Sequence, residues 1–250
     1  MRTILDYPLG DEQAALWFLG QAGYVLRDRH TCLVIDPYLT DSVAKAAPDL
    51  TRLVPVPIEP QDLKADLFVV THDHLDHLDP ETIGRYRHQE TTIFVAPHLS
   101  CRKLGSLGIP GGNVICVDRG AEAVVRGVRI RGVFAVPTDR SVSDTTGYRV
   151  EFPNGRSVYH TSDTAFSEEL LAAALAAEVL LVCINGKWGN LNAQDAARLA
   201  ARVRPKVAIP NHYDMMRPNT EDPAAFVASL REESPDTEAR VLDVLEPFVW

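Results

Sequence analysis

The run His72-Asp73-His74-Leu75-Asp76-His77 constrains this chain more than any other feature, because it places three of the eight histidines within six residues. It follows an apolar strand pattern over residues 67–71. In an extended segment, side chains two residues apart point to the same side, so His72 and His74 can bind one ion. Asp76 and His77 come one turn later and can reach a second ion. A solvated polar loop has no need of three histidines, so the run predicts a metal site at a strand end.

Two distant segments end in the same way, with a polar side chain after a short apolar strand pattern. Asp163 follows residues 157–160, and His212 follows residues 207–209. A lone histidine such as His212 is more often a core or surface residue, but its place at a strand end favours a ligand. We expect Asp163 to bridge two ions. Imidazole and carboxylate ligands without a thiolate predict one or two divalent ions, manganese or zinc.

The order of the predicted elements indicates an α/β fold, a four-layer αββα sandwich of two sheets packed face to face with helices outside. Strand patterns occur at residues 16–19, 24–27, 32–35, 67–71, 92–95, 114–117, 128–136, 147–152, 157–160, 179–184 and 207–209. Helical patterns occur at residues 80–87, 99–107, 167–177, 193–203 and 223–231. No Gly/Ser linker or charge block divides the chain, so we expect residues 1–250 to form one domain.

Composition narrows the classes of partner. The formal net charge is −9 and no run of Lys or Arg is visible, which argues against nucleic acid and anionic membrane surfaces as partners. The N-terminus lacks an apolar core of signal-peptide length, and the four cysteines show no CxxC spacing. We therefore expect a cytoplasmic protein that acts on a small molecule, and we leave open whether it forms a homo-oligomer.

Beyond the histidine run, several segments resemble the metallo-β-lactamase superfamily, in the branch that includes L-ascorbate-6-phosphate lactonase. These are residues 17–24, 35–42, 184–187, 210–215 and 219–223. By this resemblance the metal ligands are His72, His74, Asp76, His77, Asp163 and His212. The superfamily usually supplies a further histidine after the strand at residues 128–136, where this chain reads Val136-Pro137-Thr138-Asp139-Arg140-Ser141. Either Asp139 substitutes for that histidine, or the first ion has fewer ligands.

The resemblance implies hydrolysis of a lactone or related ester of a small molecule, phosphorylated or not, by hydroxide formed at the metal. We assign Asp76 to orienting the hydroxide, Asp73 to carrying a proton to the leaving alkoxide, and Asp139 to ligation or proton handling. A small-molecule phosphodiesterase is the enzymatic alternative. The absent histidine also allows a non-catalytic protein that binds a metal or a ligand.

Other polar residues near the strand ends are weaker candidates. Arg140 and Lys187 could bind an anionic group of a substrate, although isolated surface cations are commoner. Asn185, Lys187 and Trp188 follow a buried strand and could line the pocket, with a tight Asn-Gly turn as the competing explanation. Tyr213 is a further candidate for binding substrate. Asp36 could hydrogen-bond a ligand histidine or open an Asp-Pro turn, and the sequence does not choose between the two.

Overall fold

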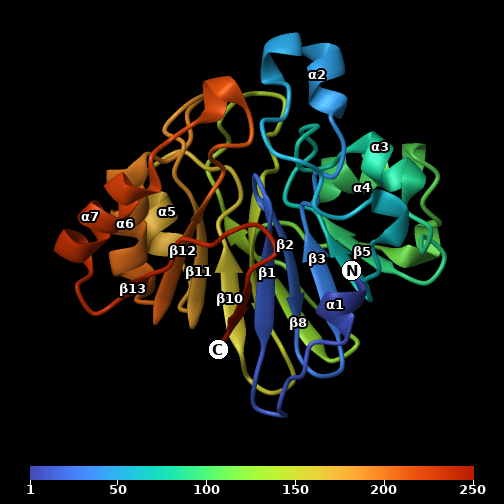
Figure 1. The fold of residues 1–250 in the computed structure, drawn as a ribbon, viewed down its shortest axis with the longest axis horizontal. Coiled ribbons are helices and arrows are strands. Elements are labelled where there is room, and N and C mark those ends of the chain that lie inside the picture. The colour runs from blue at the N-terminus through green and yellow to red at the C-terminus, as the bar shows by residue number, and fades with distance from the viewer.

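Two seven-stranded sheets form the centre of the computed structural model, which describes residues 1–250 (Figure 1). The first sheet has the order β14-β1-β2-β3-β4-β5-β6. Its strands are β1 (Ala15–Gly20), β2 (Gly23–Arg27), β3 (Cys32–Ile35), β4 (Leu67–Val69), β5 (Ile93–Ala96), β6 (Val114–Cys116) and β14 (Pro247–Val249).

The second sheet comes from the other half of the chain and has the order β13-β12-β11-β10-β9-β8-β7. Its strands are β7 (Glu122–Val125), β8 (Val128–Phe134), β9 (Thr146–Glu151), β10 (Ser157–His160), β11 (Val179–Cys183), β12 (Val207–Asn211) and β13 (Glu238–Ala239).

Helices cover the outer face of each sheet, so the predicted four-layer αββα sandwich is confirmed (Figure 1). The first sheet is covered by α1 (Arg2–Leu5), α3 (Pro80–Arg85) and α4 (His98–Ser106), and the second by α5 (Glu168–Ala173), α6 (Ala193–Val203) and α7 (Pro223–Glu233). The remaining helical segments are α2 (Ser42–Ala46) and the 3-10 turns η1 (Pro48–Leu50), η2 (Pro60–Asp62), η3 (Gly111–Asn113) and η4 (Arg217–Asn219). No helix has both the length and the apolar character needed to cross a membrane.

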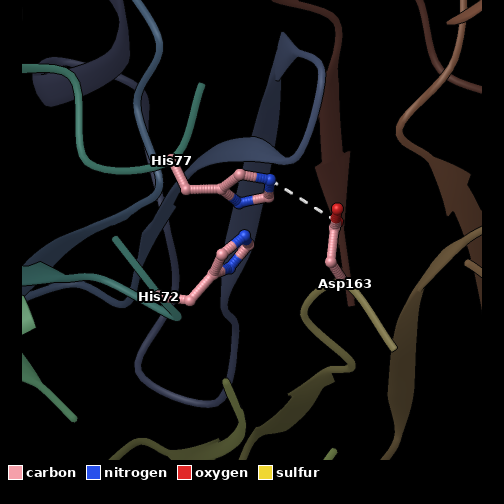
Figure 2. A group of neighbouring side chains, drawn as sticks. All are labelled: His72, His77 and Asp163. Carbon is pink, nitrogen blue, oxygen red and sulfur yellow. Dashed lines mark ion pairs between the residues drawn. The ribbon is translucent and has the colours of Figure 1, made fainter. Parts of the chain in front are cut away.

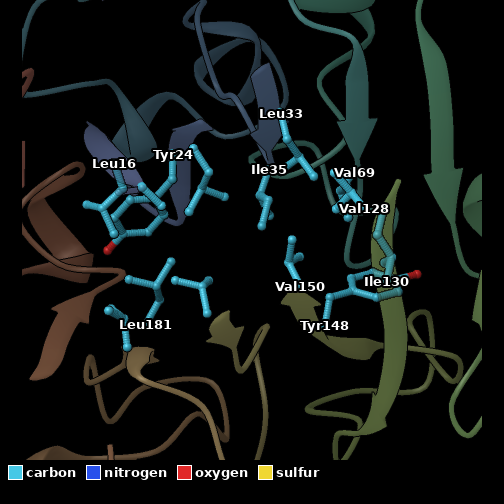
Figure 3. Close-up of a cluster of buried hydrophobic side chains, with 14 of the residues drawn as sticks. Leu16, Tyr24, Leu33, Ile35, Val69, Val128, Ile130, Tyr148, Val150 and Leu181 are labelled. Atoms are coloured by element: carbon cyan, nitrogen blue, oxygen red, sulfur yellow. The ribbon is translucent and has the colours of Figure 1, made fainter. Parts of the chain in front are cut away.

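The main hydrophobic core lies between the two sheets (Figure 3). Leu16 and Tyr24 of the first sheet and Val150 and Leu181 of the second are fully buried in it. Alternate residues of the same strands face the other way, and Trp17 packs in the outer cluster beneath α1. Burial of each such aliphatic side chain contributes about 1.5–3 kcal/mol, which explains why the strands are apolar on both faces.

Two helices begin at residues whose side chains accept hydrogen bonds from the first turn. Asn192 caps α6 by accepting from the Asp195 N–H, and Asp222 caps α7, with Pro223 at its first position. Helix α5 stops at Ala173, earlier than predicted, because the backbone turns to an extended conformation at Ala174. Strands β7, β13 and β14 were not predicted, and they lie at sheet edges where short segments carry weak patterns.

The carboxyl ends of the parallel strands bring the polar loops together. Strands β3, β4 and β5 pair in parallel, as do β10, β11 and β12. The histidine run follows β4, Asp163 follows β10, and His212 follows β12. Backbone hydrogen bonds join the loops of the two sheets, from the Thr146 N–H to the Thr71 carbonyl and from the His212 N–H to the Gln21 carbonyl. These ends therefore meet at one edge of the sandwich.

Candidate metal centre

His72, His77 and Asp163 converge at this edge, from the loop after β4 and the loop after β10 (Figure 2). Their ligand atoms lie within 4.8 Å of one another, and His77 Nε2 is 3.5 Å from Asp163 Oδ1. The Nε2 atoms of both histidines and Oδ1 of Asp163 are buried and have no hydrogen-bond partner. Buried polar atoms are normally satisfied, so three unpartnered polar atoms that converge on one point fit a divalent cation, which would replace the protons on the histidines.

A second group shares His77 and adds Asp76 and His212. His212 Nε2 is 3.5 Å from Asp76 Oδ2 and 3.1 Å from Asp163 Oδ1, while His77 Nε2 is 3.6 Å from Asp76 Oδ2. Five of the six predicted ligands therefore lie together: His72, Asp76, His77, Asp163 and His212. Their set of imidazoles and carboxylates suits zinc or manganese equally.

Asp36 orients His77. Of the two roles that the sequence left open for Asp36, the structure therefore favours a hydrogen bond to a ligand histidine. Its Oδ2 accepts from His77 Nδ1 at 2.7 Å and from Thr71 Oγ1 at 2.5 Å, and its Oδ1 accepts from the Thr71 N–H at 2.8 Å. The carboxylate fixes the ring so that Nε2 faces the centre. His72 Nδ1 is similarly engaged, at 3.0 Å from Thr71 Oγ1, which leaves its Nε2 toward the centre.

Three side-chain amides hold the carboxylates and His212, and sequence reasoning did not single them out. Gln21 Nε2 donates to Asp76 Oδ2 at 2.7 Å, and Asn190 Nδ2 donates to Asp163 Oδ2 at 2.9 Å. Asn219 Nδ2 lies 3.1 Å from His212 Nδ1. Gln21 and Asn219 fall within the segments that carry the family resemblance, which is the signal that could have found them.

The buried charges shift one another's pKa values in the metal-free centre. Burial alone would lower the pKa of His77, but the charges of Asp76, Asp163 and Asp36 outweigh it and raise that pKa to about 9. Burial is likewise outweighed at His212, where Asp163 and Asp76 raise the pKa to about 10. At His72, burial and the charge of His77 lower the pKa well below the usual value, and the charge of Asp163 offsets them only in part.

His74 stands apart from these two groups, at the rim of the centre. Its side chain is 31% exposed, and its Nε2 lies 3.2 Å from Asp139 Oδ2 and 3.1 Å from Ser141 Oγ. Hydrogen bonds from Ser141, followed by the charge of His74, hold the pKa of Asp139 below its usual range. His74 and Asp139 thus form a pair beside the centre.

A pocket of about 180 Å³ opens onto the centre. Asp76, Asp163 and His212 form part of its wall on the metal side, and Thr138 and Asp139 line it from the segment after β8. The segment in which the superfamily usually has a further histidine therefore faces the pocket.

Of the other predicted residues, Trp188 lines this pocket and the rest do not. Lys187 Nζ donates to the Thr220 carbonyl at 2.7 Å, and Asn185 Nδ2 is buried against Asn219 Oδ1 at 2.7 Å. Tyr213 is buried against Phe18, and Arg140 is exposed outside the lining. Asp73 lines a neighbouring shallow pocket with Arg102 and Lys103, so its role as a proton carrier stays a prediction.

Comparison with known proteins agrees with this geometry. A family model described as a beta-lactamase superfamily domain matches residues 31–213, more than half of the chain. A UPF0173 metal-dependent hydrolase of Hyperthermus butylicus is 28% identical over 228 residues, covering 90% of this chain and 94% of that protein. A second, from Thermoplasma acidophilum, is 27% identical over 205 residues, covering 78% and 82%.

Solved structures share the fold. Igni18, a novel metallo hydrolase from Ignicoccus hospitalis, matches with a TM-score of 0.75 at 24% identity, covering 95% of this chain and 98% of that one. The metallo-beta-lactamase fold protein YhfI from Bacillus subtilis matches with a TM-score of 0.70 at 12% identity, covering 95% and 99%. The chain therefore belongs to the β-lactamase superfamily, and its two facing sheets have the metallo-β-lactamase fold.

Proposed function

We propose that the protein is a metal-dependent hydrolase that opens a lactone or a related ester of a small molecule. The observation that carries the proposal is the set of unpartnered buried atoms on His72, His77 and Asp163 beside an open pocket. Relatives named metal-dependent hydrolases, similar over most of their length, support the reaction class. The resemblance to the branch that includes L-ascorbate-6-phosphate lactonase supports an ester as the bond cleaved.

The residues that would hold manganese or zinc are His72, Asp76, His77, Asp163 and His212, with the pair His74 and Asp139 beside them. A bound divalent ion would supply positive charge that polarises the scissile carbonyl and lowers the pKa of the attacking water. The chain's contribution is to fix the ligands, through Asp36, Gln21, Asn190 and Asn219.

Asp76 is the residue that would orient the attacking water. Gln21 fixes one of its oxygens at 2.7 Å, and its side chain is 19% exposed toward the pocket that it lines. In the step, the water oxygen bonds to the carbonyl carbon, the ring C–O bond breaks, and the alkoxide takes up the proton that the water loses. His74 and Asp139, at the rim, lie where they can pass that proton.

Phosphodiester hydrolysis is the weaker candidate on this geometry. None of the 13 residues that line the pocket is Lys or Arg, the side chains that usually bind phosphate oxygens away from a metal. A small molecule is the proposed partner, because a net charge of −9 opposes a nucleic-acid polymer.

The test is a comparison of lactones and chromogenic phosphodiesters as substrates of the metal-loaded protein. We expect lactone turnover, and we expect Asp76→Ala to lower kcat by about 100-fold or more while KM changes little. Asp236→Ala, which removes an exposed aspartate outside the pocket, is the control. Phosphodiester turnover without lactone turnover would exclude the proposed substrate class, and unchanged kcat in a folded, metal-loaded Asp76→Ala variant would exclude the role of Asp76.

A further inference from the structure

Trp188 is the most conspicuous apolar residue at the pocket. It lines the pocket and is 56% exposed, and it is the only aromatic among the large hydrophobic side chains that are exposed. An exposed tryptophan ring at a pocket offers a large apolar area that a bound molecule can cover.

The backbone holds Trp188 in a left-handed conformation, with a φ of 51°. A non-glycine residue in this region costs about 1–2 kcal/mol and persists only where the surroundings impose it. The two neighbouring glycines, Gly186 and Gly189, also have positive φ, which lets the chain turn sharply enough to project the ring.

Three contacts hold the loop that carries Trp188, so the fold fixes the backbone of this residue beside the pocket. Lys187 Nζ donates to the Thr220 carbonyl at 2.7 Å, and Asn190 donates to Asp163 at 2.9 Å. Gly189 lies so close to Thr138 that an added Cβ would come within 3.3 Å of its carbonyl oxygen. The same amide of Asn190 thus links the loop to a metal-ligand candidate.

Aliphatic side chains form a second part of the pocket wall: Val43 of α2, Leu50 of η1 and Met216. They belong to one small hydrophobic cluster with Tyr38 and Met215. A β-bridge between Arg52 and Met216 and a hydrogen bond from the Leu53 N–H to the Met215 carbonyl brace this wall. Figure 1 shows α2 above the ends of the strands, clear of both sheets.

The charges that line the pocket disfavour an anionic group on a substrate. The pocket lining contains three aspartates and neither Lys nor Arg. Asp76 and Asp163 belong to the metal-ligand groups, but Asp139 stands at the rim and would repel a negative group of a substrate.

We propose that the pocket takes a neutral lactone or ester with an apolar substituent, which lies between Trp188 and the wall of Val43, Leu50 and Met216. This inference rests on the proposed hydrolysis and names its substrate class. The carbonyl faces Asp76 and the metal-ligand groups, and the apolar substituent points toward α2. Trp188 then determines substrate specificity through the apolar area that its ring buries against the substituent.

The experiment measures kcat/KM of the metal-loaded protein for γ-lactones with alkyl substituents of one, three and five carbons. Each buried methylene should raise kcat/KM by about two- to fourfold. Trp188→Ala should lower the ratio between the five-carbon and one-carbon lactones by at least threefold, and Trp188→Phe should retain most of it. Val124→Ala, which truncates an equally exposed side chain on β7 outside the pocket, should leave the ratio unchanged.

A charged analogue sharpens the test. A γ-lactone with a phosphate group at the end of its chain should be cleaved at least tenfold less efficiently than the neutral five-carbon lactone, because Asp139 repels the phosphate. A preference for the phosphate analogue, a rate independent of chain length, or an unchanged ratio in Trp188→Ala would overturn the inference.

A binding measurement separates this inference from the proposed reaction. The γ-lactams with the same alkyl chains resist hydrolysis, and their binding can be followed by calorimetry in the wild type and in Trp188→Ala. If no lactone is cleaved but lactam affinity rises with chain length in a Trp188-dependent way, the pocket is assigned correctly and the reaction is not. If lactam affinity shows no such rise, the apolar subsite is refuted whatever the reaction.

Discussion

The Asp36 carboxylate accepts a hydrogen bond from Nδ1 of His77 at 2.7 Å, and both side chains are completely buried. This bond decides which nitrogen of His77 is available, because only Nε2 then faces the centre. Asp36 also accepts two hydrogen bonds from Thr71, the residue just before the histidine run. The carboxylate therefore ties the end of β4 to the ligand that the run supplies.

Asp36→Asn should weaken metal binding by about 10- to 100-fold, because an amide holds the histidine less firmly and lacks the charge that raises its basicity. Competition with a chelator of known affinity measures the change. Asp66→Asn is the matched control, since Asp66 also accepts a backbone N–H, from Cys32, but lies away from the centre. Equal affinity in both variants would show that Asp36 has no influence on the metal.

Metal binding should release protons at neutral pH, because the pKa values of His77 and His212 are raised to about 9 and about 10 in the metal-free protein. At pH 7 both rings are then protonated, and an ion must displace about two protons. Affinity should rise with pH and level off above the two pKa values. Calorimetry in buffers of different ionisation enthalpy would count the protons, and a heat independent of the buffer would contradict the prediction.

The same raised pKa values determine whether the metal-free protein gains or loses folding stability as pH rises. A folded-state pKa raised above 6.5 stabilises the fold fully below pH 6.5, and this contribution is lost as pH rises through about 9 and about 10. Urea unfolding of the chelator-treated protein at pH 7 and pH 10 would follow this loss.

His77→Ala and His212→Ala should each weaken metal binding more than His74→Ala. The first two residues belong to the buried groups of ligand atoms, whereas His74 is partly exposed and turned to Asp139. An ion with fewer ligands to begin with has less affinity to lose. Titration of the metal-free variants with manganese and with zinc measures the difference, and an equal loss in all three would refute the asymmetry.

Asp139→Asn should change the pH dependence of turnover or the metal stoichiometry, because it keeps the shape of the side chain and removes the charge beside His74. Asp139→His should raise metal content from one ion toward two if the absent histidine limits occupancy. Elemental analysis and a pH–rate profile are the measurements. If both stay as in the wild type for Asp139→Asn, the segment after β8 takes no part in the chemistry.

The strands and the histidine run could be predicted because each depends on a local pattern. Alternation and apolar runs identify β1, β2 and β4, and the spacing of His72 to His77 identifies a metal site without knowledge of the fold. Gln21 could not be found in this way. It supports Asp76 from 55 residues away, and a glutamine in a turn carries no local sign of that contact.

Tertiary contacts also outweighed the local preference for helix at the end of α5. The alanine-rich segment after Ala173 favours helix, yet α5 ends there because the chain must enter β11. Glu178, at that entrance, accepts from Arg156 and Lys206, which lie at the starts of the two strands beside β11. Trp188 was expected to line the pocket and does so, but its exposure depends on a positive φ that no sequence pattern encodes.

The candidate ligands come from both sheets, since His72 and His77 follow β4 whereas Asp163 and His212 follow β10 and β12. An ion bound to all of them would cross-link the two halves of the sandwich. Free ion at a hundredfold excess over its Kd would stabilise the folded state by about 2.7 kcal/mol, and the melting temperature would rise accordingly. A comparison of the rise in melting temperature with different ions would therefore show which ion the protein binds most tightly. This measurement needs no known substrate.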